Sequence, residues 1–404
     1  MSKARAAATL VVATLTSLAG LAITSPPATA DGPGVGTPWV VSVGDSYISG
    51  EAGRWAGSSN SSAARADAGG PTTYFDNAGN TAEQIERCHR SKAAEIHIGG
   101  GVNSLNLACS GAKTVSATDG DYFKPGLDFY DNGAGRQGQA KMLQSFATTH
   151  NVKMVTVSIG GNDFNFAAIV QQCVVDFLYS PSWWPDYCYD DSVVTNAMAS
   201  SNVAAVKTRI ATALLNIRTA MRNAGYADAS WTLLVQNYPS PIPTSSGFRY
   251  SQSGYTRQNT GGCGFWNNDA NYANNTLLPT INNTVFGAIT QAGITNVKTL
   301  NLASSFNGRR LCETGVGLYE EVGVANWTAS NAVDKTEWVN QIRTVSTAGS
   351  DYYIQESLHP NYWGQLATRS CVRQAYNAGV PRSGTCARSG TGLTSSGEPR
   401  MTLS

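Results

Sequence analysis

Residues 39–55 read WVVSVGDSYISGEAGRW. The opening residues are almost continuously apolar, which is typical of a strand buried on both faces of a parallel sheet. The apolar run stops at Gly44, Asp45 and Ser46. A serine in this place is either a turn or helix-capping residue, or a nucleophile held at the carboxyl end of a strand.

Similar apolar runs recur along the chain, and helix-like runs lie between them. Strands alternating with helices predict an α/β protein whose parallel sheet is covered by helices on both faces. Two of the helix-like runs end on a glycine, a common helix stop. The further strand-like runs are residues 104–109, 152–160, 230–238 and 295–303, and the helix-like runs are residues 137–150, 201–225 and 274–293.

The composition is that of a weakly charged globular protein. The chain has 404 residues, of which 42% are hydrophobic and 14% charged, and its formal net charge is +1. This length is ample for a sizeable core. Because there is no basic excess, we expect no nucleic-acid partner.

The amino terminus has the pattern of an export signal. Lys3 and Arg5 precede a diluted apolar stretch, and the small residues before Asp31 form a cleavage pattern. The alternative is a membrane anchor. We expect residues 1–30 to be a signal peptide, followed by a single domain over 31–388 and a flexible tail over 389–404. The mature protein is then a secreted monomer without stable membrane insertion.

Eight cysteines in an exported chain predict disulfide bonds. Zinc is the rival interpretation, but the chain has no C-x-x-C pair and its four histidines are scattered. Eight cysteines allow 105 pairings. We choose neighbour pairing, in which each bond closes a local loop: Cys88–Cys109, Cys173–Cys188, Cys263–Cys312 and Cys371–Cys386.

Small polar residues follow three of the predicted strands, where sites form in parallel sheets. They are Ser46 after the first strand, Gly111 after the second and Asn162 after the third; His359 follows the last strand. A serine nucleophile needs a base to take its proton, and acyl transfer needs donors for the oxyanion. The backbone N–H groups of Ser46 and Gly111 and the side-chain amide of Asn162 could serve as those donors.

The blocks GDS (44–46), ACSGA (108–112), GGND (160–163) and ESLHP (356–360) resemble the four signature blocks of the SGNH (GDSL) hydrolases, and CHRS (88–91) resembles exported actinobacterial members. The resemblance implies a flavodoxin-like three-layer sandwich with a five-stranded parallel sheet. It also implies Ser46 as nucleophile, His359 as base, and Ser46, Gly111 and Asn162 as the oxyanion hole. No cofactor or metal is implied.

One position departs from the family pattern. The family usually has aspartate three residues before the histidine, and this chain has Glu356. We predict a Ser46–His359–Glu356 triad; the alternative is a histidine oriented by a backbone carbonyl, as in some members of the family. His89, beside a half-cystine, is expected to be structural.

The loop between Cys173 and Cys188 is rich in aromatic residues. Exposed apolar groups next to a site often contact a ligand or a membrane, so Phe177, Trp183 and Trp184 are candidate substrate-binding residues. The equally weighted alternative is a small satellite core.

These features predict a secreted serine carboxylic-ester hydrolase acting on lipid or aryl esters through an acyl-enzyme. Phospholipase A or lysophospholipase, and feruloyl- or acetyl-sugar esterase, are alternative activities. A carbohydrate- or surface-binding protein on the same fold is the non-enzyme alternative, which the nine Trp and 17 Tyr would suit.

Overall fold

The computed structural model describes residues 32–344 and 354–404. Its main sheet has the strand order β2-β1-β5-β6-β7-β8-β9, and all neighbours are parallel except β8 and β9. The strands of this sheet are β1 (Pro38–Gly44), β2 (Asn103–Asn106), β5 (Asn151–Ser158), β6 (Thr232–Gln236), β7 (Val297–Asn301), β8 (Gly384–Leu393) and β9 (Pro399–Leu403).

The five predicted strands are all present, and each lies within about three residues of its expected bounds. Their order, β2-β1-β5-β6-β7, is the flavodoxin-like order, so the predicted fold class is confirmed. The sheet has seven strands and not the five expected, because β8 and β9 extend it beyond β7. Strands β1 and β5 are interior strands and buried, as their apolar sequences require. Their pairing sets Gly44 opposite Ser158 at the carboxyl end of the sheet.

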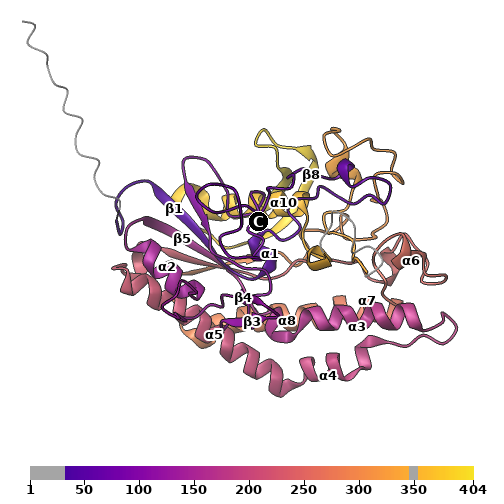
Figure 1. Ribbon diagram of the computed structural model, residues 1–404, viewed down its shortest axis with the longest axis horizontal. Coiled ribbons are helices and arrows are strands. Elements are labelled where there is room, and N and C mark those ends of the chain that lie inside the picture. Colours follow the sequence, from indigo (N-terminus) through magenta and orange to yellow (C-terminus); the bar gives the residue numbers. More distant parts are fainter. Residues whose placement is uncertain (1–31, 345–353) are drawn as a thin grey trace, which may run out of the picture. The chain divides into compact units, whose positions relative to one another are not determined.

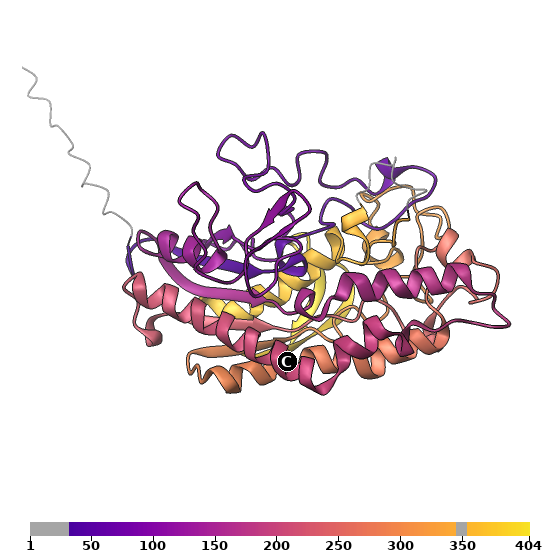
Figure 2. The same cartoon turned by 60° about the horizontal axis from the view of Figure 1, so that its bottom comes forward.

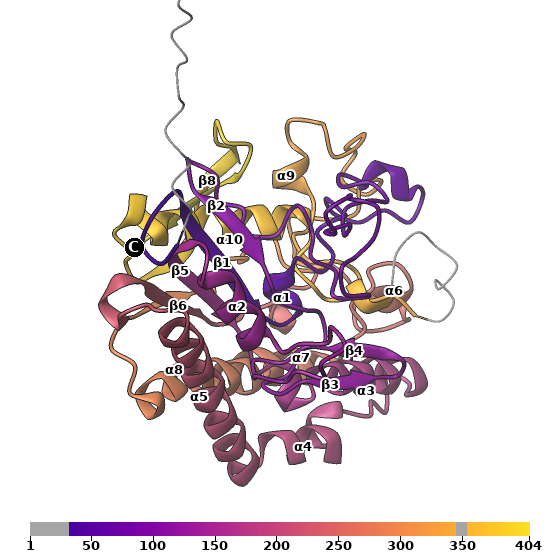
Figure 3. The same cartoon turned by 60° about the vertical axis from the view of Figure 1, so that its left-hand side comes forward.

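Helices cover both faces of the sheet (Figures 1 and 3). Helices α2 (Gln139–Ala147), α5 (Ser200–Asn223) and α8 (Leu278–Ala292) pack together on one side, and α10 (Tyr362–Tyr376) lies on the other. Helices α2, α5 and α8 bury apolar residues at helical spacing, whereas α10 is buried on nearly all sides. No helix among residues 32–344 and 354–404 has the length and apolar character needed to cross a bilayer.

Shorter elements decorate this core. The remaining helices are α1 (Ser46–Ser49), α3 (Phe166–Tyr179), α4 (Ser192–Met198), α6 (Thr256–Asn259), α7 (Asn267–Tyr272) and α9 (Ala332–Lys335), with a π-helical turn at Ala273–Leu277 before α8 and a 3₁₀ turn, η8 (Ile354–Glu356), before the histidine block. Strands β3 (Ala117–Asp119) and β4 (Tyr122–Lys124) form a separate antiparallel pair.

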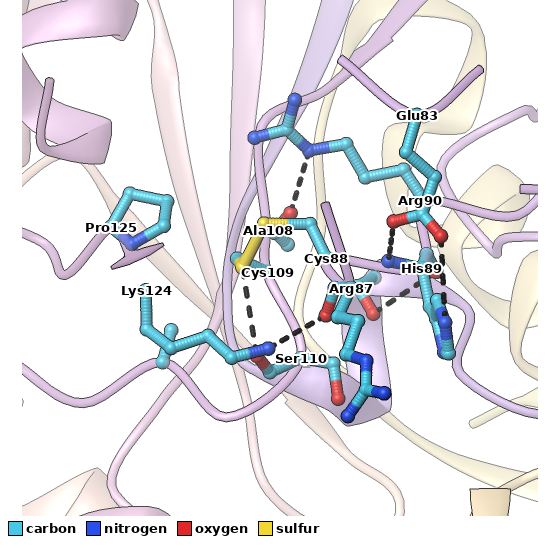
Figure 4. The surroundings of a disulfide bond; sticks show 12 residues. Glu83, Arg87, Cys88, His89, Arg90, Ala108, Cys109, Ser110, Lys124 and Pro125 are labelled. Atoms are coloured by element: carbon cyan, nitrogen blue, oxygen red, sulfur yellow. Dashed lines mark hydrogen bonds and ion pairs between the residues drawn. A yellow bond between two sulfur atoms is a disulfide. The ribbon is translucent and has the colours of Figure 1, made fainter. Parts of the chain in front are cut away.

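All eight cysteines are paired as neighbours, so the predicted disulfide pattern is confirmed. The Cys88–Cys109 bond ties the CHRS segment to the end of β2 (Figure 4). The Cys371–Cys386 bond ties α10 to β8.

The carboxyl terminus differs from the expectation of a flexible tail over 389–404. Strand β8 adds to β7 in parallel, and β9 returns antiparallel to β8. Met401 and Leu403 are buried, and Arg373 of α10 makes two hydrogen bonds of 2.6 Å to the Glu398 carboxylate. The alternation of buried and exposed residues over 399–403 is a strand signal, but it is short and follows a glycine- and serine-rich stretch.

Removal of residues 389–404 should therefore destabilise the protein. Two buried apolar side chains and a bidentate ion pair are lost, so we expect the melting temperature to fall by about 5 °C or more. Arg400→Ala, at an exposed position of β9, is the matched control and should leave the melting temperature nearly unchanged. A truncated protein as stable as the full chain would restore the flexible-tail interpretation.

Candidate active site

The site begins where β1 ends. Gly44 has a φ of +133°, and a Cβ on it would lie 1.9 Å from the Ser158 carbonyl oxygen, so only glycine fits this close approach to β5. The Gln139 side chain accepts a hydrogen bond from the Gly44 N–H (2.6 Å) and donates one to the Gly44 carbonyl (2.8 Å). The first residue of α2 thus holds the turn that carries Ser46.

Ser46 and His359 are in direct contact, although 313 residues separate them. The distance from His359 Nε2 to Ser46 Oγ is 2.7 Å. The other ring nitrogen, Nδ1, lies 2.9 Å from the Ser357 carbonyl oxygen, which fixes Nδ1 as the protonated nitrogen and leaves Nε2 as the acceptor. The Tyr47 hydroxyl donates to the Leu358 carbonyl at 3.0 Å and so fastens the histidine segment to α1.

The surroundings of His359 keep the ring neutral near pH 7. Burial lowers its pKa below the ordinary value, while the negative charge of Glu51 and the hydrogen bond to the Ser357 carbonyl act in the opposite direction. A neutral imidazole with a free Nε2 lone pair is the form that can accept the Ser46 proton.

Asp45 connects the serine block to the Asn162 block. Its carboxylate caps α1 by accepting from the Tyr47 N–H (3.2 Å) and also accepts a short hydrogen bond from the Tyr238 hydroxyl. The same hydroxyl accepts from the Gly161 N–H at 3.0 Å. Burial raises the pKa of Asp45 to about 7, although these hydrogen bonds oppose the shift.

The Asn162 amide lies beside the Gly111 block. One of its two N–H groups donates to the Ala112 carbonyl at 2.9 Å, which orients the amide and leaves the second N–H for another acceptor. Within the described part of the chain, the backbone N–H groups of Ser46 and Gly111 have no hydrogen-bond acceptor. The oxyanion role of the Ser46, Gly111 and Asn162 donors stays a prediction.

Glu356 does not fill the place expected for it. Its carboxylate accepts hydrogen bonds from Trp55 Nε1 (2.7 Å) and the Tyr74 hydroxyl (2.5 Å). The η8 turn directs it toward those two side chains, while the ring of His359 is held by the carbonyl of Ser357. The arrangement is a Ser46–His359 dyad, so the predicted triad with Glu356 is corrected to the backbone-carbonyl alternative.

The aromatic segment 177–184 was expected either to contact substrate or to form a satellite core, and its residues differ in burial. Phe177 is fully buried against Trp266, with ring centroids 4.7 Å apart, so it belongs to a satellite core and its assignment to substrate is wrong. Trp183 and Trp184 are 81% and 75% exposed. They follow a 14-residue helix about 21 Å long that begins at the Asn162 block, and the loop extends outward in Figure 2.

Gln139 and Tyr238, which shape the turn around Ser46, were not anticipated from the sequence. They belong to a helix start and a strand end, and neither stands in a recognisable motif. His89 is buried among carboxylates, as expected of a structural residue. The described residues contain no group of three or more His, Cys, Asp or Glu side chains arranged to hold a metal ion.

Neither protein-family models nor curated protein sequences give a match to this chain. Among solved structures, the extracellular lipase from Streptomyces rimosus is similar with a TM-score of 0.42 at 18% identity, over 85% of this chain and 100% of that chain. The phospholipase A1 from Streptomyces albidoflavus NA297 has a TM-score of 0.41 at 18% identity, over 82% and 95%. The carbohydrate acetylesterase Est24 from Sinorhizobium meliloti has 0.27 at 11%, over 65% and 83%. Similarity at this level assigns no role to any residue.

The dyad arrangement predicts that Glu356→Gln affects stability more than catalysis. An amide in place of this buried carboxylate mispairs with Trp55 or Tyr74, at a cost of about 1–3 kcal/mol. We expect a lower melting temperature and a kcat within about threefold of wild type, whereas amidation of a true triad acid costs about 10,000-fold. A folded variant with a kcat reduced by that order would reinstate the triad.

Proposed function

We propose that the protein is a serine hydrolase that cleaves carboxylic esters through an acyl-enzyme. The observation that carries this proposal is the 2.7 Å contact between Ser46 Oγ and His359 Nε2 at the carboxyl edge of the sheet. This pair favours an enzyme over a binding protein, because a neutral histidine in hydrogen-bond contact with a serine can take the serine proton and so activate it as a nucleophile. The Ser46 side chain is only slightly accessible, which suits a nucleophile reached through a shaped site.

The reaction follows from this pair. Ser46 Oγ attacks the ester carbonyl carbon while its proton passes to His359 Nε2, and the carbonyl oxygen becomes an oxyanion. As the tetrahedral intermediate collapses, the imidazolium gives that proton to the leaving alcohol. Water then attacks the acyl-serine with the same base, which releases the carboxylic acid and restores the Ser46 hydroxyl.

The oxyanion is stabilised by donors from three strand ends: the N–H groups of Ser46 and Gly111 and the second amide N–H of Asn162. The Ala112 carbonyl and the Tyr238–Gly161 contact hold Asn162 in place before substrate arrives. Donors fixed in advance need no reorganisation during the reaction, which is the source of their effect.

For the substrate we propose lipid or aryl esters, and for the location the exterior of the cell. Four disulfides favour an oxidising compartment. Three exposed aromatic residues support a lipid substrate: Tyr179 at the end of α3, and Trp183 and Trp184 in the loop after it. The Ser180 hydroxyl braces this loop by accepting from the Asp186 N–H at 2.9 Å. Amphipathic indole and phenol rings favour lipid–water interfaces.

Ser46→Ala tests the nucleophile. The variant should fold as wild type does and lose nearly all hydrolysis of p-nitrophenyl acetate, and a fluorophosphonate should label the wild-type protein at Ser46 only. His359→Ala should lose a similar factor, because the two residues act as a unit. If Ser46→Ala kept more than about a tenth of the rate, Ser46 would not be the nucleophile.

Asn162→Ala tests the oxyanion donor. Loss of one such donor usually costs about 100- to 1000-fold in kcat, with little change in KM. Asp163→Asn is a control at the next residue: Asp163 holds Thr114 and Arg209 and should affect melting temperature more than kcat. An unchanged kcat in Asn162→Ala would remove Asn162 from the oxyanion hole.

The loop tip is tested with a substrate pair. A double variant with Trp183→Ala and Trp184→Ala should raise the apparent KM for phosphatidylcholine vesicles or long-chain esters by about tenfold or more. The reason is that burial of a large apolar side chain contributes roughly 1.5–3 kcal/mol. Soluble p-nitrophenyl acetate should be unaffected. Tyr130→Ala, a partly exposed aromatic elsewhere, is the control. Equal losses on both substrates would contradict a lipid-contact role.

A further inference from the structure

A buried charged cluster lies beside the dyad. Glu51, which follows α1, is completely buried, and its Oε1 is 2.7 Å from His89 Nδ1. His89 also contacts Glu83 and stacks on Tyr74 with ring centroids 4.3 Å apart (Figure 4 shows His89 with Glu83). Burial opposes ionisation, but the positive charge of His89 lowers the pKa of Glu51 to about 2. Glu51 is therefore a carboxylate at every pH where the protein would work.

The side chain of Gln355 links Glu51 to the segment that carries His359 and to the segment that carries Gly111. Gln355, four residues before His359, donates to Glu51 Oε2 (2.9 Å) and to Ser110 Oγ (2.8 Å). Ser110 precedes the oxyanion residue Gly111, and its own N–H donates to the Cys88 carbonyl at 3.0 Å. Glu51 and Gln355 thus fasten the histidine segment to the oxyanion segment.

The dyad itself supplies no negative charge to the histidine. The partner of His359 Nδ1 is a neutral carbonyl, whereas the acid of a triad stabilises the imidazolium that forms during the reaction. A fixed carboxylate nearby gives the same sign of stabilisation through space, and burial weakens its screening by solvent. Among the acidic residues, Glu51 is the one whose charge acts most strongly on His359.

We propose that Glu51 is a positioning residue for the ester hydrolysis proposed above: through Gln355 it holds His359 against the oxyanion segment, and its negative charge stabilises the imidazolium of His359. The inference rests on the proposed function. It assigns to Glu51 a role in the reaction that needs no hydrogen bond to the His359 ring, whose two nitrogens contact the Ser357 carbonyl and the Ser46 hydroxyl.

The surrounding charges give the proposal a directional test. His89 opposes Glu51 at His359, because its positive charge disfavours a second imidazolium. Carboxylates that face His89 raise its pKa in spite of its burial, so both charges are present on the acid side of the pH profile. The ionisable groups around Glu51 and His89 are His359, Glu83, Glu356, Tyr74 and Lys124.

The experiment is the pH dependence of kcat and kcat/KM for p-nitrophenyl acetate in the wild type and two variants at Glu51. Glu51→Gln should lower kcat about 10- to 100-fold and move the acid limb to lower pH by about 0.5–1 unit, since His359 loses a stabilising anion. Glu51→Asp keeps the negative charge on a shorter side chain, so its acid limb should stay near the wild-type pH even where kcat falls.

A merely structural role predicts something else. General loosening of the site would lower kcat in both variants without moving the limb of Glu51→Gln to lower pH, and an unchanged kcat and limb in Glu51→Gln would overturn the proposal outright. If the variants at buried positions do not fold, Gln355→Ala at a half-buried position serves as the test. It should lower kcat about tenfold with KM unchanged, because His359 is held less firmly. A wild-type kcat in Gln355→Ala would refute the positioning role. An inactive wild-type protein would instead refute the proposed function.

Discussion

The close approach of β1 to β5 at Gly44 is the constraint on which the site depends. A side chain there would collide with the Ser158 carbonyl, so the two central strands can converge only at a residue without a Cβ. The Gln139 amide satisfies both backbone groups of this glycine. The chain can then turn from a buried strand into α1, which brings the Ser46 hydroxyl to the sheet edge.

Polar contacts link this turn to the Asn162 block and to the histidine segment. Asp45 caps α1 and, through Tyr238, reaches the backbone of the Asn162 block. Tyr47 holds the histidine segment from the opposite direction. Most of these contacts are buried, where an unpaired polar group is costly, so the blocks hold one another in place around Ser46 and His359.

Much of this was predictable, and the failures have physical causes. Continuous apolar runs identified the five parallel strands, because that signal is local. The even count of cysteines predicted disulfides, and the neighbour pairing chosen for them is the one present in the structure. Glu356 was misplaced because its backbone turns toward Trp55 and Tyr74, contacts that span about 300 residues. Phe177 was misplaced because an aromatic residue in a loop-forming sequence reads the same whether it is buried or exposed.

By itself, the sequence determined which side chains are available: a serine at a strand end, a histidine in a short motif, and glycines that permit close turns. Periodicity and short motifs encode these because they depend on neighbouring residues. Only the tertiary structure decided how the chemistry is arranged. In the folded protein the partner of His359 Nδ1 is the Ser357 carbonyl and not Glu356. Glu51 is linked to the histidine segment through Gln355, and the carboxyl terminus forms strands β8 and β9. Such choices depend on burial and on contacts between distant segments, which no local pattern records.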